Sequence, residues 1–202
     1  MRFAQQRDAA KPLEGGLPGF LEKYVGACDG FFDGGKCRAE AEKFRAEAAG
    51  QEFWAVVREG ETDMVEMGAY DPRTGGWILR ITPAFPGGRH LLSLGAPLRY
   101  EEDGSPVFRA LEIPVPPDLK MTPMDVRRML EAKAVRLQLV FSPGEVWVAE
   151  QGGKKRYGVQ ATLRALLVTL GTSGRKLTTW FAEPEAKGPP RAKAAKAPQK
   201  RR

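Results

Sequence analysis

The two cysteines, Cys28 and Cys37, are the residues whose spacing most directly suggests chemistry. Eight residues separate them, and they lie at the end of one predicted helix and the start of the next. If this loop folds back, a disulfide closes a ten-residue ring, worth roughly 2.5–3 kcal/mol by chain entropy. The spacing is not the C-x-x-C of a redox enzyme, and two cysteines are too few for a zinc site. We therefore predict a structural disulfide, with two free core thiols or a redox-active pair as the alternatives.

The cysteine pair also bears on the compartment. A disulfide implies an oxidising environment, so we expect a periplasmic or secreted protein. The alternative is a cytoplasmic protein, because no apolar core of a signal peptide follows Arg2. Whether the native chain begins at Met1 stays open. No stretch approaches the ~20 apolar residues of a membrane helix, so no transmembrane segment is expected.

The same loop imitates a calcium-binding loop. Carboxylates or glycine stand at four of the positions that an EF-hand uses, but Phe31 and Cys37 occupy two other ligand positions and offer no hard oxygen. We interpret the match as coincidence and expect no metal ion and no cofactor. The matching residues are Asp29, Asp33, Gly34 and Glu40.

His90 is the only histidine and therefore the only imidazole that could serve a catalytic triad. None of the candidate serines stands in the G-x-S-x-G context of a nucleophile elbow. The run 171–176 lacks the spacing of a phosphate-binding loop and is interpreted as a hairpin turn. We expect His90 to be a surface or strand histidine and the protein to be non-enzymatic. The serines are Ser93, Ser105, Ser142 and Ser173.

The net charge of +7 is concentrated at the C-terminus. Residues 183–202 hold seven basic and two acidic side chains, which leaves a net charge of +2 for residues 1–182. The tail is rich in lysine, alanine and proline and is predicted to be disordered. It is either a solubilising appendage or a site for nucleic acid or another anionic surface. The candidate anion-binding residues are Lys193, Lys196, Lys200, Arg201 and Arg202.

The rest of the chain divides into an extended lead-in, residues 1–16, and a single domain, residues 17–182. Helical spacing predicts helices over 17–25 and 38–49, which together form an N-terminal helical hairpin. A further helix is predicted to begin at Thr122, an N-cap residue followed by Pro123 and, three positions after the cap, by Asp125. A hydrophobic content of 42% supports a folded core.

Alternating apolar residues predict strands over 53–57, 62–70, 77–82, 90–94 and 107–113. The C-terminal third predicts a meander: a strand over 135–141, a turn at 142–144, then strands at 146–149, 157–167 and 177–181. Short turns between alternating strands are typical of antiparallel sheets. We therefore expect an α+β fold, a curved antiparallel sheet or partly open barrel with an N-terminal helical hairpin and one inserted helix.

Several segments resemble an uncharacterised family of exported myxobacterial proteins, over about residues 12–181. The resemblance rests on residues 20–28 with Cys37 and Arg38, on 77–83, and on 134–141 followed by Val146 and Trp147. It implies a periplasmic or secreted location and a disulfide, and it supplies no activity. We therefore expect an extracytoplasmic binding or structural protein with an unknown ligand or protein partner at its sheet face or barrel mouth. The alternative is a cytoplasmic, nucleic-acid-associated protein that acts through its tail.

Overall fold

The structure is a computed structural model of the full chain. It describes residues 1–26, 34–57, 65–73, 76–95, 97–102, 106–115, 122, 124–125, 127–128, 135–151, 154–170 and 174–182. None of the helices within these residues is long and apolar enough to span a membrane.

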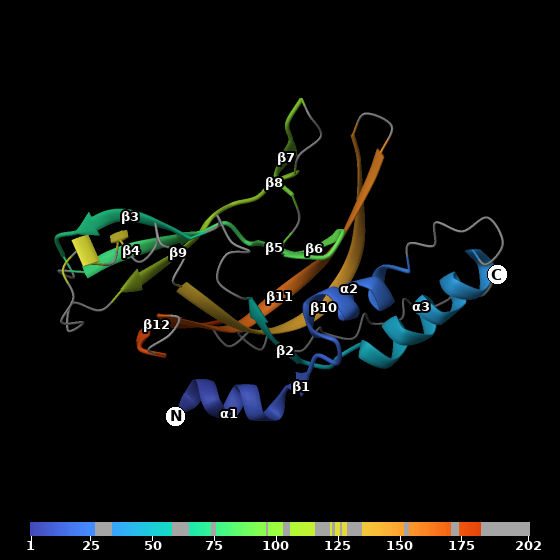
Figure 1. The fold of residues 1–202 in the computed structure, drawn as a ribbon, viewed down its shortest axis with the longest axis horizontal. Helices are drawn as coiled ribbons and strands as arrows, with labels where there is room; N and C mark the ends of the chain where they lie inside the picture. Colours follow the sequence, from blue (N-terminus) through green and yellow to red (C-terminus); the bar gives the residue numbers. More distant parts are fainter. Residues whose placement is uncertain are drawn as a thin grey trace, which may run out of the picture.

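Two long antiparallel strands, β10 (Val135–Gln151) and β11 (Lys154–Leu170), form the spine of the molecule (Figure 1). They belong to a seven-stranded sheet in the order β1-β2-β10-β11-β6-β5, with β12 also paired to β11. The sheet is mainly antiparallel, but β1 runs parallel to β2 and β6 runs parallel to β11. The other strands are β1 (Lys11–Pro12), β2 (Phe53–Val57), β5 (Ala84–Gly87), β6 (His90–Leu94) and β12 (Lys176–Phe181).

The turn predicted at residues 142–144 is wrong. The chain continues through these residues as one strand, and the register against β11 shifts between Pro143 and Val146. Gly144 stands at this irregularity, where an added Cβ would lie 2.9 Å from the carbonyl oxygen of Gln160. Ser-Pro-Gly therefore forms a β-bulge, which re-aims a strand without ending it.

The two faces of the large sheet carry cores of different size. One face belongs to a continuous core that includes Leu139, Phe141 and Val159 together with residues of α2 (Gly16–Val25). The other face carries a small core, in which Phe3 and Ala10 pack with two sheet residues. Those two residues are Val140 and Ala165.

Residues 1–16 were expected to be extended, but the chain begins with the helix α1 (Arg2–Ala9). This helix is polar, so its sequence shows little helical periodicity. Phe3 contributes to the small core, and the guanidinium carbon of Arg2 lies 4.3 Å from the ring centroid of Phe181. Tertiary contacts with the sheet thus stabilise a helix that local pattern does not predict. β1 follows it directly.

Helix α2 is confirmed, and α3 (Gly34–Ala48) begins earlier than expected. The two helices are in contact: the rings of Phe20 and Phe44 have centroids 5.8 Å apart, and Arg45 donates a hydrogen bond of 2.9 Å to the carbonyl of Tyr24. Ala41, Phe44 and Ala48 form the inward-facing side of α3: both alanines are buried, and Phe44 packs against the main core. The segment that joins the helices lies outside the described residues, so the hairpin stays a prediction.

A second sheet contains β3 (Val65–Asp71), β4 (Gly76–Ile81) and β9 (Leu111–Val115), all antiparallel. The strands predicted over 62–70 and 77–82 are therefore confirmed for the described residues, which begin at Val65, and they pair with each other antiparallel. The hydroxyl of Thr178 on β12 donates a hydrogen bond of 2.7 Å to the carbonyl of Pro114, which ties the small sheet to the large one. A two-stranded arm, β7 (Arg99–Tyr100) and β8 (Pro106–Val107), completes the strands.

The predicted N-cap at Thr122 is confirmed. The Thr122 hydroxyl accepts a hydrogen bond from the backbone N–H of Asp125 at 3.2 Å, and the Asp125 carboxylate accepts from the Thr122 N–H at 2.9 Å. These hydrogen bonds from Thr122 lower the pKa of Asp125. This reciprocal pairing is a capping box. The described residues after it, 124–125 and 127–128, are helical.

The α+β class and the antiparallel character of the sheets are confirmed. The large sheet does not close into a barrel in the part of the chain that the structure describes. The exposed edges of this open sheet therefore become candidate sites for interactions.

Candidate functional site: a groove between the two sheets

A groove of about 980 Å³ lies where the small sheet meets the large one. Its lining combines apolar side chains such as Leu94, Leu111 and Leu163 with charged and polar ones. This volume lies near the upper end of the range for small-molecule sites, and the mixed lining is typical of such sites. The polar lining residues are Glu66, Arg80, Thr82, Arg109, Glu112, Gln160 and Thr162, with Trp180 beside them.

The groove reaches the edge of β11 because β6 and β12, which pair with the same side of β11, leave a gap between them. β6 pairs with residues 158–161 of β11, and β12 pairs with residues 165–169. The backbone N–H of Ala182 donates to the carbonyl of Arg164 at 2.9 Å, which extends the second contact by one residue. Thr162 and Leu163 therefore have no strand on this side among the described residues. Backbone groups of a strand edge can pair with an added extended segment.

A cross-strand row of charges forms one wall of the groove. Glu66 on β3 is the register partner of Arg80 on β4, which is in turn the partner of Glu112 on β9. Side chains in register share one face of a sheet. The Arg80 guanidinium donates to the Glu112 carboxylate at 3.1 Å, with both side chains about half exposed. Arg109 also lines the groove, so the lining carries two positive and two negative charges.

A second polar cluster joins α2 to β6. The guanidinium of Arg89 donates two hydrogen bonds to the carboxylate of Glu22, at 2.5 and 3.2 Å. Nε2 of His90 lies 3.2 Å from the same carboxylate, and the His90 side chain is 1% exposed. The hydrogen bond from Arg89 is the main cause that lowers the pKa of Glu22, partly opposed by burial. The cluster fastens α2 to the strand that borders the groove.

His90 does not assemble a triad with the described serines. The histidine lies in strand β6, as expected, but it is buried and not on the surface. The hydroxyl of Ser93 accepts from the indole N–H of Trp147 at 2.9 Å and donates to the carbonyl of Gly95 at 3.0 Å. The hydroxyl of Ser142 accepts from Arg164 at 3.2 Å. Ser105 and Ser173 lie outside the described residues.

The predicted cysteine pair is described only in part. Cys37 lies on α3, with its sulfur 3.8 Å from the carbonyl oxygen of Gly26 at the end of α2. Cys28 lies outside the described residues, as do Asp29 and Asp33 of the calcium-like loop. The described part of the chain contains no group of three or more side chains that could hold a metal ion.

The tail residues Lys193, Lys196, Lys200, Arg201 and Arg202 also lie outside the described residues, so the predicted anion-binding role is untested.

A model of a family of unknown function, DUF6066, matches residues 1–191. The chain belongs to this family. No curated protein matches the chain, and no solved structure does. Membership of DUF6066 confirms that the relatives are uncharacterised, whereas their exported and myxobacterial character stays a prediction.

The groove residues were missed at the sequence level. Glu66, Arg80 and Glu112 come from strands separated by loops, and only the strand register brings them into one row. The sequence contains one weak signal for them. Each of these charged residues stands between two apolar residues, a pattern that indicates the solvent-exposed face of a strand.

Proposed function

We propose that this DUF6066 protein is a non-enzymatic, extracytoplasmic binding protein that holds a short extended peptide segment in the groove between its two sheets. The observation that carries this proposal is the groove itself. Apolar side chains and a balanced set of charges line it, and it lies at the part of β11 between β6 and β12 where the described residues place no strand on that side.

The chemistry of the lining favours a peptide over a charged metabolite. Two arginines and two glutamates line the groove, so its formal charge is zero and a strongly charged ligand gains little. Carboxylates, guanidinium groups, Gln160 and Thr162 together offer both donors and acceptors. A peptide main chain presents the same mixture along its length, while its apolar side chains match Leu94, Leu111 and Leu163.

The test uses a pool of acetylated, amidated tetrapeptides, which carry no terminal charge. Saturation-transfer nuclear magnetic resonance on the full chain identifies the peptides that bind, and titration gives their affinities. We expect Arg80→Ala and Arg109→Ala to weaken the best peptide by about tenfold, the usual cost of one hydrogen bond to a charged group.

Arg136→Ala is the matched control, since Arg136 is an exposed arginine on β10 that does not line the groove. It should leave peptide affinity unchanged. If no peptide in the pool gave a signal, or if all three variants bound the best peptide as tightly as the wild type does, the groove would not be a peptide site.

The extracytoplasmic location depends on the cysteines. Support comes from Cys37, the one cysteine among the described residues, which does not carry a free thiol. We propose that Cys37 pairs with Cys28. Mass spectrometry of the unreduced protein after alkylation should find no alkylated cysteine. Two alkylated thiols would remove the disulfide and the periplasmic or secreted location with it.

The charge of the tail favours a second candidate, a cytoplasmic nucleic-acid-associated protein. Seven of the twenty residues from 183 to 202 are basic. Electrostatic binding of this kind weakens steeply with salt. Binding of a DNA duplex by the full chain and by a 1–182 truncation, at two salt concentrations, tests it. Salt-sensitive binding that is lost on truncation supports this candidate, and weak, equal binding by both forms rejects it.

A further inference from the structure

The outer half of β10 is an open edge, separate from the groove. β2 pairs with β10 only from Leu137 to Phe141, and β11 pairs with it on the other side along its whole length. Among the described residues, no strand lies on the β2 side of β10 beyond Phe141. The hydroxyl of Tyr24 on α2 donates to the carbonyl of Gly144 at 2.8 Å, next to the start of this edge. The remaining edge runs from Glu145 towards the hairpin tip.

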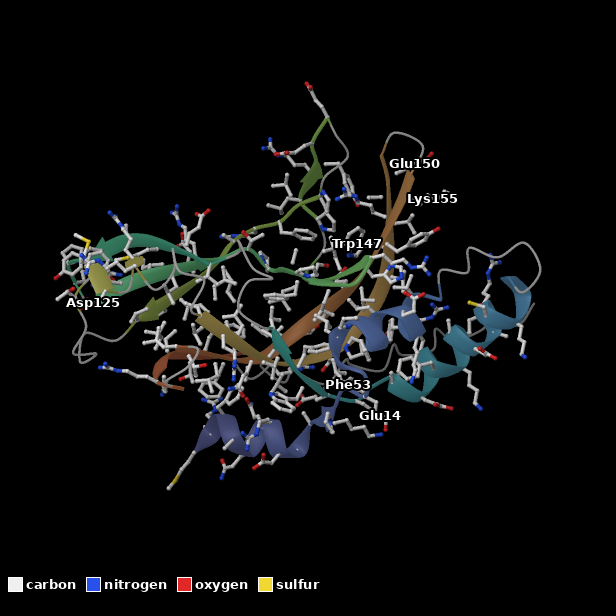
Figure 2. All side chains as sticks on the ribbon, viewed as in Figure 1. Glu14, Phe53, Asp125, Trp147, Glu150 and Lys155 are labelled. Atoms are coloured by element: carbon white, nitrogen blue, oxygen red, sulfur yellow. The ribbon has the colours of Figure 1, made fainter. Side chains whose placement is uncertain are left out.

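The edge is apolar in the middle and acidic at both sides. Val146, Trp147, Val148 and Ala149 are flanked by Glu145 and Glu150. Val148 is 51% exposed, which is high for a valine in the middle of a strand. Figure 2 shows Glu150 and Lys155 at the outer end of the hairpin, beyond Trp147. A long edge strand of this composition readily accepts another strand.

We propose that the β10 edge binds the β10 edge of a second copy of this chain, antiparallel, about a two-fold axis at Val148. This inference goes beyond the proposed ligand site and does not depend on it. A two-fold contact uses the same surface on both copies, as most homodimers do.

The order of the side chains selects this register. With Val148 opposite its own copy, Trp147 faces Ala149, large against small, and Val146 faces Glu150. A shift by one residue in one direction places Glu145 opposite Glu150, and like charges directly opposite are destabilising. A shift in the other direction places the apolar ring of Trp147 opposite Glu150. The symmetric register thus extends the sheet through both molecules and covers the exposed valine.

Trp147 is held in one orientation for such a contact. Its ring packs on Gly158, where an added Cβ would lie 2.1 Å from the ring, and its indole N–H donates to Ser93 at 2.9 Å. Phe108 lies beside it, with ring centroids 6.2 Å apart. A fixed aromatic side chain loses little conformational entropy when a second molecule binds.

The test is cross-linking of Val148→Cys by mild oxidation. Directly opposite residues of an antiparallel pair have Cβ atoms about 4.5–5.5 Å apart, close enough for a disulfide after small adjustment. Tyr70→Cys is the matched control, because Tyr70 on β3 is also 51% exposed. We expect covalent dimer from Val148→Cys at least about tenfold faster than from Tyr70→Cys or the wild type. Equal rates would overturn the proposal.

Sedimentation provides an independent measurement. The average mass of the wild-type full chain should rise with concentration, and Val148→Lys should weaken association by about tenfold or more, since two lysines then stand opposite each other. Circular dichroism checks that the variant is folded. A wild type that stays monomeric, or a folded Val148→Lys variant that associates equally well, would exclude this interface.

Discussion

The two faces of the large sheet differ in what their helices contribute. α2 places five buried residues in the main core, whereas α1 places only Phe3, in a core of four buried residues. Both helices cover the same strands, β10 and β11, from opposite sides (Figure 1). Helix stability in proteins comes mainly from packing of an apolar face. The α2 face should therefore determine whether the chain folds, while α1 adds a modest increment.

Leu21→Ala should have the largest effect. Leu21 is completely buried on α2, in contact with the core beneath it. Truncation of such a leucine leaves a cavity and costs about 2–5 kcal/mol of unfolding free energy. Urea unfolding followed by circular dichroism measures the change. A loss no greater than that of an α1 variant would contradict the proposed difference between the faces.

Gly158→Ala should lower the free energy of unfolding by about 1–3 kcal/mol, the usual range for adding a group to a well-packed site. The new methyl group would overlap the Trp147 ring, so the ring must move and its hydrogen bond to Ser93 must lengthen. Both urea unfolding and tryptophan fluorescence should change. Gly35→Ala is the control, because a Cβ at Gly35 on α3 meets nothing within 4 Å; it should be neutral or slightly stabilising.

Phe3→Ala should lower the free energy of unfolding by about 1–2 kcal/mol. This is less than the ~3–5 kcal/mol lost when a phenylalanine in a large core is replaced by alanine, because the small cluster around Phe3 can collapse into the gap. The same urea assay measures it. The circular dichroism of the sheet should persist. Loss of the whole fold would show that the α1 face is as important as the α2 face.

Glu22→Gln should produce the smallest effect, and the effect should depend on pH. The pKa of Glu22 is lowered in the folded protein, chiefly by its hydrogen bonds from Arg89. A lowered pKa stabilises the fold above the unfolded-state pKa, and this stabilisation is lost as pH falls through the folded-state pKa. Wild type and variant should therefore differ most near neutral pH and converge in acid. Thermal melts across this pH range measure the difference, which is small because the carboxylate is half exposed.

The local sequence pattern was sufficient to predict an element where buried and exposed residues alternate regularly along the segment. The strands 53–57 and 90–94, the helix α2 and the Thr122 cap were all predictable, because period-two alternation, helical spacing and capping depend on neighbouring residues. The Ser142-Pro143-Gly144 segment failed for a physical reason. The same three residues suit a turn and a bulge, and only the presence of β11 alongside decides between them.

Residue order and alternation were enough to predict the α+β class, the antiparallel pairing of the C-terminal strands and the concentration of positive charge in the tail. Only the tertiary contacts fixed which charges line the groove, that α1 is helical and that His90 is buried beside Glu22. These properties depend on register and strand order, which bring distant residues together through contacts that no local pattern records.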